Sequence, residues 1–200
     1  MNFPEHPIDT PRLDVIRKFL RSNTGLNLGC GRTRFPFKIN VDVKTEHSNT
    51  DIIADARDLS MFKDGSMDEV VFADVIEHIL EKDVGVALKE IRRVLKKGGR
   101  LFLSTPNDTW LCKILDPVWW MSGHRHYCNQ EINRLLLSAG FKEVVAFTCG
   151  KIPFGVVTLA YAVNWAFRRK TAYLFGDVVR KAYNGAIGNK GGTLYAIATK

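Results

Sequence analysis

Residues 26–43, LNLGCGRTRFPFKINVDV, place a Gly-Cys-Gly turn after a short apolar run and before a second apolar run that ends near Asp42. Apolar runs without alternation are typical of strands that are buried on both faces of a parallel sheet. The pattern therefore predicts two neighbouring strands with a glycine turn between them. Such a turn is either a nucleotide-binding loop or only a tight turn between two strands, since glycine adopts positive φ angles at little cost.

The segments on either side extend this pattern. We expect strands at 26–28, 39–43, 52–54, 69–73, 100–105, 141–148 and 193–199, and helices at 11–21, 83–97 and 129–140. The helix 83–97 has an apolar stripe formed by Val84, Leu88, Ile91 and Leu95, and Gly98-Gly99 is its expected stop. Strands that alternate with helices predict an α/β fold, a Rossmann-like doubly wound sheet of about seven mostly parallel strands.

The length of 200 residues and the apolar content of 46% suffice for one domain with a substantial core. We therefore expect a single domain over residues 1–200. The four cysteines, Cys30, Cys112, Cys128 and Cys149, form no Cys-x-x-Cys pair, and no signal sequence opens the chain. This pattern favours a reduced, cytoplasmic protein.

Positive charge is concentrated in the last quarter of the sequence. Residues 151–200 carry 8 Lys and Arg against 1 Asp, which is +7 of the total net charge of +8. This excess favours an anionic partner such as a lipid surface, a phosphorylated carrier or nucleic acid, although a solvated basic face gives the same count. The uncharged segment 152–167 is shorter than the roughly 20 apolar residues of a spanning helix. We expect an interfacial or substrate-covering helix there, or a helix packed on the domain.

The glycine turn fits neither of two common nucleotide motifs. A dinucleotide fingerprint requires a third glycine at the position of Arg34, and the Gly-Lys-Ser/Thr of a P-loop appears nowhere. Acidic residues instead mark the ends of two strands: Asp42 lies at the end of the second strand, and Asp55 follows the third. In a doubly wound sheet these strand ends face one crevice, and a carboxylate can accept from both hydroxyls of a ribose. The spacing suits an adenosine that carries something other than a pyrophosphate.

Six segments together resemble the class I S-adenosylmethionine-dependent methyltransferases, in particular the small type 11 group. These segments are LNLGCG, NVDV, ADARDL, DGSMDEVVFADVIEHI, RRVLKKGGRLFLSTPN and HRHYCNQEINRLLLSAGF, and the match covers roughly residues 24–148 and the last strand. The resemblance implies S-adenosylmethionine as the cofactor and an antiparallel last strand. It also implies acceptor-side loop or helical insertions at 106–128 and 150–191.

The resemblance implies a set of cofactor-binding residues: Leu28, Gly29, Cys30, Gly31, Arg32, Asp42, Val43, Asp55, Ala56, Asp74 and Val75. In this assignment the glycines admit the methionine and ribose portion, and Asp42 binds the ribose hydroxyls. Asp55 with Ala56 holds the adenine, and Asp74 begins the loop under the methionine portion. A capping or turn role is the alternative for each acid.

The sequence departs from the family between the first two strands, where a full helix is usual. Only eight residues, Gly31 to Lys38, are present, whereas parallel neighbours ordinarily need about a dozen or more. We therefore expect a shortened helix of at most one turn, or a loop. A helix N-terminus that would help to bind the methionine carboxylate is then lost. Arg32 or Arg34 is expected to bind the methionine carboxylate instead, because a guanidinium can donate two parallel hydrogen bonds to a carboxylate.

Methyl transfer from a sulfonium is an in-line displacement that requires alignment and the exclusion of water, but no metal ion. A hydroxyl or amine acceptor also needs a base, for which His78 and His126 are the candidates. Ordering a loop or capping a helix is the alternative role for each histidine. Trp110, Trp119 and Trp120 are equally suited to an acceptor wall or to core packing.

Three functions remain open from the sequence. The first is methyl transfer to a hydroxyl or amine of a small-molecule, glycan or lipid-linked acceptor, by a cytoplasmic enzyme with peripheral contact at the inner membrane face. The second is nucleic-acid methylation, which is less favoured because no Asn-Pro-Pro-Tyr-like motif follows the fourth strand. The third is a non-catalytic scaffold that keeps the fold, against which the intact glycine turn and Asp42 argue.

Overall fold

The computed structural model describes residues 10–22, 24–31, 33–35, 38–44, 50–115, 125–150, 187–188 and 191–200. Its elements are, in order, α1 (Thr10–Arg17), β1 (Gly25–Leu28), β2 (Ile39–Asp42), β3 (Ile52–Ile53), β4 (Met67–Ala73), the 3-10 helix η1 (Ile76–His78), α2 (Glu81–Val94), β5 (Leu95–Pro106), α3 (Trp110–Leu115), α5 (Asn129–Ser138), β6 (Lys142–Cys149), β7 (Ile187–Gly188) and β8 (Thr193–Thr199).

The chain divides into two compact units, each of which is described by itself. Unit 1 holds the described residues within 1–19, 106–128 and 147–194, and unit 2 holds those within 20–105, 129–146 and 195–200. The described parts of the expected insertions 106–128 and 150–191 belong to unit 1. The glycine turn, Asp42 at the end of β2, and the acids Asp55 and Asp74 that follow β3 and β4 all belong to unit 2.

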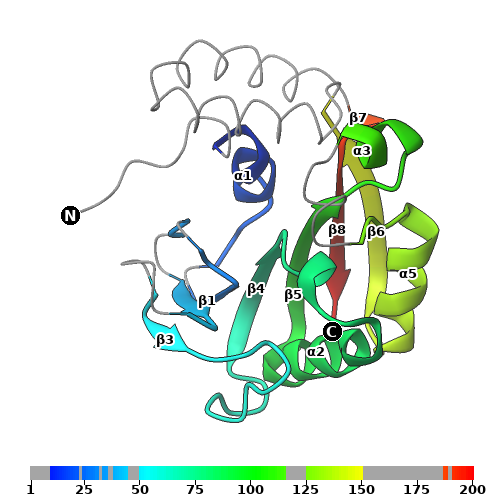
Figure 1. The fold of residues 1–200 in the computed structure, drawn as a ribbon. Helices are drawn as coiled ribbons and strands as arrows, with labels where there is room; N and C mark the ends of the chain where they lie inside the picture. The colour runs from blue at the N-terminus through cyan, green and yellow to red at the C-terminus, as the bar shows by residue number, and fades with distance from the viewer. Residues whose placement is uncertain are drawn as a thin grey trace, which may run out of the picture. The chain divides into compact units, whose positions relative to one another are not determined.

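The sheet has the mixed, mostly parallel topology that the sequence predicts (Figure 1). The strand order is β3-β2-β1-β4-β5-β8-β6, and the two-residue β7 pairs antiparallel with the end of β6. The pairs β1–β2, β1–β4, β2–β3 and β4–β5 are parallel. β8 is antiparallel to β5, since Lys200 exchanges hydrogen bonds with Gly98 and Gly99, while Asn107, just after the far end of β5, donates to Gly192 O. The α/β fold class is confirmed.

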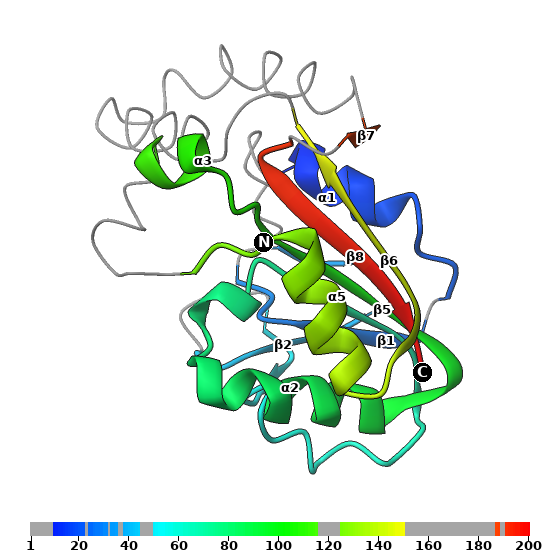
Figure 2. The same ribbon diagram turned by 90° about the vertical axis from the view of Figure 1, so that its right-hand side faces the viewer.

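The central strands of unit 2 are apolar because both of their faces are covered. All four residues of β1 are buried, and Val70, Val71 and Phe72 of β4 are completely inaccessible. Helices α2 and α5 lie on the same face of the sheet (Figure 2). The buried stripe of α2 consists of Val84, Ala87, Leu88, Ile91 and Val94, which recur at the helical period.

The predicted end of the helix 83–97 was wrong. α2 ends at Val94, and Leu95 begins β5 by pairing with Met67 of β4. Lys200 stabilises the end of the helix at Val94. Its Nζ donates to Arg93 O at 3.0 Å and to Leu95 O at 2.6 Å, and so satisfies carbonyls at the helix terminus. The glycines that we expected to stop the helix instead lie in an irregular stretch of β5, between the pairs Met67–Leu95 and Glu69–Arg100.

One other helix differs in length from the sequence prediction. α1 ends at Arg17 and is shorter than the expected helix 11–21, although Val15 and Ile16 are buried as expected of an amphipathic helix. α3 lies within 106–128, where we expected a loop or helical insertion, and Trp110 at its start is 72% exposed. Within the described part of the chain, no helix has the length and apolar character needed to cross a bilayer.

The short connection between β1 and β2 is stabilised by buried amides. Its described residues, 29–31, 33–35 and 38, contain no helix, in agreement with the sequence prediction. Asn40 is fully buried, and its Oδ1 accepts from Asn27 Nδ2 at 3.0 Å and from the Phe35 N–H at 3.3 Å. Asn27 Nδ2 also donates to Thr33 O at 3.1 Å. These hydrogen bonds satisfy loop groups that a crossover helix would otherwise satisfy within itself.

Candidate active site

Loops at the carboxyl ends of the parallel strands meet in unit 2. β1 lies between β2 and β4, with Leu28 opposite Val41 on one side and opposite Phe72 on the other. The glycine turn after β1 is therefore flanked by the ends of the strands that carry Asp42 and Asp74. This edge is the one at which doubly wound sheets bind their ligands.

The two glycines of the turn have different roles. Gly29 has φ +67°, and a Cβ built on it would lie 2.3 Å from Val75 Cγ2, so the Val75 side chain fills the space that Gly29 leaves. Gly31 has φ +50°, yet a Cβ there would meet nothing within 4 Å. Gly29 thus permits the β1 turn to pack on the loop after β4, whereas Gly31 borders open space from which a ligand can approach the backbone.

Asp42 is held in place by backbone donors. Its Oδ2 accepts the Gly31 N–H at 2.7 Å, and its Oδ1 accepts the Lys44 N–H at 3.2 Å. A carboxylate offers about four acceptor sites, so this half-buried side chain keeps capacity for the hydroxyls of a ribose. The backbone of the glycine turn is also hydrogen-bonded to β2, because the Cys30 N–H donates to Val41 O at 3.0 Å.

Three further residues of the implied set contribute differently. Leu28 and Cys30 are buried, so that their side chains belong to the core, and only their backbone can face a ligand. Burial raises the pKa of the Cys30 thiol, which lies 3.6 Å from Thr50 Oγ1. Cys30 is therefore a protonated core residue and not a nucleophile. Val43, in contrast, is 56% exposed beside Asp42.

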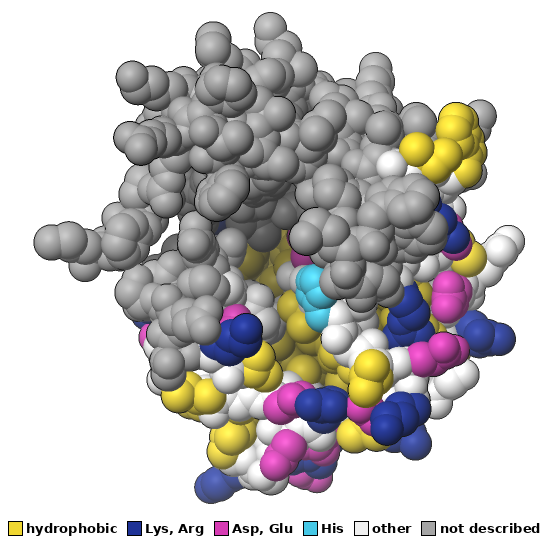
Figure 3. Space-filling view, viewed as in Figure 1, with side chains coloured by type: hydrophobic (Ala, Val, Ile, Leu, Met, Phe, Trp, Pro, Cys, Tyr) yellow, Lys and Arg dark blue, Asp and Glu magenta, His cyan; other side chains and the backbone are white. Residues whose placement is uncertain are grey.

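Asp55, the acid assigned to the adenine, is held by Arg57. Arg57 donates to Asp55 from its backbone N–H, Nε and Nη2 at 2.8, 2.9 and 2.7 Å, and its Nη1 donates to Asp83 Oδ2 at 3.0 Å. These hydrogen bonds hold the pKa of Asp55 below its usual range, although partial burial acts in the opposite direction. Ala56 lies between the two residues in the same turn. In the view of Figure 3, acidic and basic side chains lie interleaved on the lower part of the described surface.

Asp74 changes the direction of the chain at the end of β4. Its φ of +54° is a left-handed conformation that few residues other than glycine, Asn and Asp adopt. Ser104 of β5 fixes this conformation, because its carbonyl accepts the Asp74 N–H at 2.9 Å and its hydroxyl donates to Asp74 Oδ1 at 3.0 Å. The turn directs Val75 toward Gly29 and leads into η1.

The two candidate bases belong to different units. His78 is exposed at the end of η1 in unit 2, directly after Glu77, a buried carboxylate that accepts from Thr105 Oγ1 at 3.1 Å. His126 is buried in unit 1, with 7% of its surface exposed. Beside it, the Tyr127 N–H donates to Pro106 O at 3.1 Å. Of the two imidazoles, that of His78 is the accessible one.

Arg34 has a partner within the protein. Its Nη2 lies 3.1 Å from Asp51 Oδ1, and the other oxygen of Asp51 accepts the Asn40 N–H at 2.8 Å. The guanidinium thus supports the short β1–β2 connection, while half of its side chain remains exposed. Other positions that the sequence singled out, Arg32, Trp119, Trp120 and the segment 152–167, lie outside the described residues.

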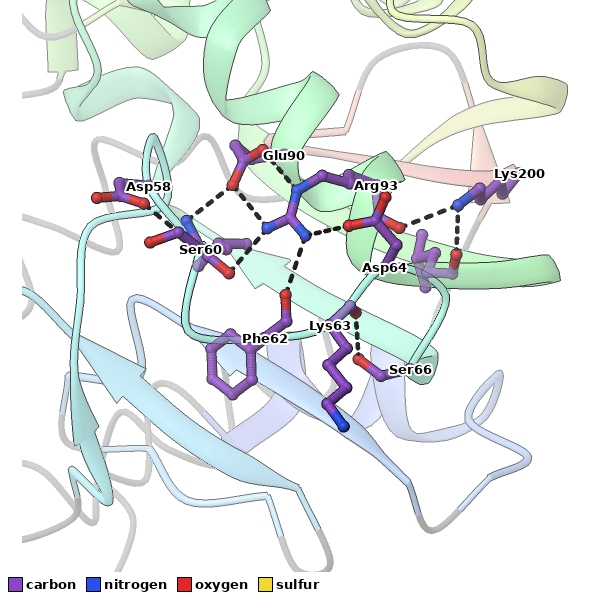
Figure 4. A network of polar contacts seen from close by, with 11 residues as sticks. Asp58, Ser60, Phe62, Lys63, Asp64, Ser66, Glu90, Arg93 and Lys200 are labelled. Carbon is purple, nitrogen blue, oxygen red and sulfur yellow. Dashed lines mark hydrogen bonds and ion pairs between the residues drawn. The ribbon is translucent and has the colours of Figure 1, made fainter.

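The loop 54–66, which carries Asp55, is fastened to α2 by Arg93 (Figure 4). The guanidinium of Arg93 donates to Leu59 O at 2.8 Å, Phe62 O at 2.9 Å, Asp64 Oδ1 at 2.6 Å and the two oxygens of Glu90 at 2.8 and 2.9 Å. Glu90 in turn accepts the Leu59 N–H at 2.9 Å. This network fixes the loop that presents the acid assigned to the adenine.

Sequence reasoning did not assign a role to Arg57, Ser104 or Arg93. Arg57 follows Asp55 by two residues, the spacing of an Asx turn, so its opposite charge was a usable signal. The roles of Ser104 and Arg93 depend on contacts about 30 residues away in the chain, which no local pattern records.

Residues 26–103 match a family model described as a methyltransferase domain. No curated protein matches the sequence. Among solved structures, a SAM-dependent methyltransferase from Thermotoga maritima, described as a possible histamine N-methyltransferase, is similar with a TM-score of 0.71. Its identity is 20%, and the match covers 96% of this chain and 88% of that one.

Two further solved structures share the fold. A SAM-dependent methyltransferase from Archaeoglobus fulgidus has a TM-score of 0.65 and 15% identity, with 96% of this chain and 93% of that one covered. Phosphoethanolamine N-methyltransferase 2 of Haemonchus contortus, in complex with S-adenosyl-L-methionine, has a TM-score of 0.61 and 17% identity. In that case 96% of this chain and 52% of the other are covered.

Proposed function

From the class I, S-adenosylmethionine-dependent methyltransferase domain that this chain carries, we infer that it methylates a hydroxyl or amine of a small-molecule, glycan or lipid-linked acceptor. S-adenosylmethionine is the cofactor of the domain, and the protein is an enzyme. The acceptor and the residues assigned to each step are our proposal.

The observation that carries the proposal is the link between Asp42 and Gly31. The hydrogen bond of 2.7 Å from the Gly31 N–H orients the carboxylate at the edge where β1 and β2 end. Asp42 then binds the ribose hydroxyls, and the open space beside Gly31 admits the methionine portion. Asp74 and Val75, fixed by Ser104, form the adjoining loop on the β4 side.

When bound, S-adenosylmethionine supplies an electrophilic methyl group on a sulfonium. The contribution of the protein is to align the acceptor oxygen or nitrogen with that methyl carbon, so that the new bond forms as the carbon–sulfur bond breaks. His78 is the proposed base that takes the proton of the acceptor, because it is exposed on the loop that follows Asp74. His126 is the second candidate for this base.

A small amine or alcohol that carries an anionic group is the acceptor class that we favour. One of the similar structures is a phosphoethanolamine N-methyltransferase, which acts on a small phosphorylated amine. The last quarter of this chain carries a net charge of +7, which would attract such an anion or an anionic lipid headgroup. We accordingly propose a cytoplasmic protein that contacts the inner membrane face peripherally.

Two measurements test the proposed function. S-adenosylhomocysteine at a hundredfold its Kd should stabilise the folded chain by about 2.7 kcal/mol, which thermal unfolding detects. Transfer of a labelled methyl group to a panel of phosphorylated amines, glycans and lipid-linked amines or alcohols should then identify the acceptor. Absence of any shift with S-adenosylmethionine and S-adenosylhomocysteine would favour a scaffold, and salt-dependent binding of RNA or DNA would favour a nucleic-acid substrate.

A further inference from the structure

Asp55 and Arg57 are joined by more hydrogen bonds than an ordinary surface ion pair. The backbone N–H, Nε and Nη2 of Arg57 all donate to the two oxygens of Asp55, at 2.7 to 2.9 Å. The remaining arm of the guanidinium, Nη1, donates to Asp83 Oδ2 at 3.0 Å on the first turn of α2. Arg57 thus holds Asp55 at three points and is itself anchored to a helix.

The hydrogen-bonding capacity of Asp55 leaves room for one ligand donor. An ionised carboxylate offers about four acceptor sites, two on each oxygen. Oδ1 accepts twice, from the backbone N–H and Nε of Arg57, and Oδ2 accepts once, from Nη2. The vacant site is therefore on Oδ2, and 36% of the Asp55 side chain is open to solvent.

We propose that Arg57 is a positioning residue for base recognition: it orients Asp55 so that the free Oδ2 site accepts a hydrogen bond from the exocyclic amine of the adenine. The inference rests on the proposed function, since it assumes that the base lies beside Asp55. It makes Arg57 the residue through which the enzyme distinguishes a 6-amino purine from a 6-oxo purine.

The discrimination has two parts, the charge of Asp55 and its orientation. The carboxyl is ionised at neutral pH, so that it only accepts hydrogen bonds, and the three hydrogen bonds from Arg57 fix the direction in which its free site points. An adenine amine donates to it, whereas the carbonyl oxygen of a hypoxanthine would face a second acceptor and leave both groups unpaired. Without Arg57 the carboxylate could rotate or bind water, and its preference for a donor at this position would weaken.

The test compares two ligands that differ only at this position, S-adenosylhomocysteine and its deaminated analogue S-inosylhomocysteine, by calorimetry on the full chain. The wild type should prefer the adenosyl ligand by at least about tenfold. Arg57→Ala should reduce the ratio to within about threefold, and Arg57→Lys, which keeps the charge but cannot fork, should restore part of it. Asp55→Asn should shrink or reverse the preference, because an amide can donate to the carbonyl.

Lys96→Ala is the matched control, since Lys96 forms an exposed pair with Asp68 at the opposite ends of the strands and should leave the ratio unchanged. The inference is overturned if the wild type binds both ligands equally, or if Arg57→Ala keeps the full ratio while Asp55→Asn abolishes it. Failure of the proposed function would give a different result, because neither the wild type nor any variant would then bind S-adenosylhomocysteine.

Discussion

The Asp42 carboxylate accepts the Gly31 N–H at 2.7 Å, and this hydrogen bond joins the end of β2 to the glycine turn after β1. Replacement by Asn keeps the shape but removes the charge, so we expect Asp42→Asn to weaken S-adenosylhomocysteine binding about tenfold to a hundredfold in calorimetry. Asp58→Asn, which changes an exposed turn acid in the next loop, is the control and should bind normally. Equal affinity of the two variants for S-adenosylhomocysteine would contradict the assignment of Asp42 to the ribose hydroxyls.

Gly29 and Gly31 should respond differently to an added methyl group. Gly29→Ala meets Val75 at 2.3 Å as well as a positive φ, so we expect a loss of unfolding free energy of at least about 2 kcal/mol in urea titrations. Gly31→Ala meets open space and should cost about 1 kcal/mol from its backbone conformation alone, while weakening cofactor binding. The double variant Gly29→Ala/Val75→Ala should recover part of the lost stability, and strict additivity of the two changes would contradict the packing explanation.

Arg93 should contribute more to stability than its neighbour Arg92. Arg93→Ala removes donors from two carbonyls, Asp64 and Glu90, and should cost about 2 to 3 kcal/mol in chemical denaturation. Arg92→Ala removes a hydrogen bond to Gly140 O and should cost about 1 kcal/mol or less. If the two variants were equally stable, the network in Figure 4 would not fasten the loop that carries Asp55.

The buried pair of Glu69 and Lys38 should make stability depend on acid pH. Both side chains are almost inaccessible and lie 2.9 Å apart. Burial raises the pKa of Glu69, but hydrogen bonds from the Arg21 N–H and Lys38 outweigh it, and the pKa lies below the usual value of 4.5. The contribution of Glu69 is therefore complete above about pH 4.5 and is lost as the pH falls through the lower folded value.

Glu69→Gln tests this dependence by thermal unfolding across acid pH. It should cost about 3 to 5 kcal/mol at neutral pH, because Lys38 is left as a buried charge, and it should flatten the loss of stability below pH 4.5. Asp68→Asn changes a more exposed pair with Lys96 and should cost about 1 kcal/mol or less. An unchanged acid profile in Glu69→Gln would assign the transition to other carboxylates.

His78 should affect turnover but not cofactor binding. With the acceptor in hand, we expect His78→Ala to lower kcat about a hundredfold or more and to leave the affinity for S-adenosylhomocysteine unchanged. His126→Ala, assayed in parallel, reports on the buried imidazole of unit 1. Full turnover in both variants would exclude a histidine base.

Much of the fold was determined by local sequence. Strands such as β1, β4 and β8 and the stripe of α2 follow from apolar periodicity, because burial on one or both faces selects residue types at fixed spacing. The positions of Gly29, Asp42, Asp55 and Asp74 at strand ends could likewise be predicted, since parallel strands end at one edge of the sheet.

Other features were decided only by tertiary contacts. α2 ends at Val94 because Leu95 pairs with Met67 and Lys200 satisfies its carbonyls, and these partners lie about 30 and 105 residues away in the chain. The abrupt connection after β1 holds because Asn27 and Asn40 come into contact across neighbouring strands. The ion pair of Arg34 with Asp51 and the hydrogen bonds of Arg93 to the loop 54–66 likewise form only on folding. Sequence patterns record which residues must be buried, whereas the partner of each buried polar group is chosen by chain segments that meet only in the folded state.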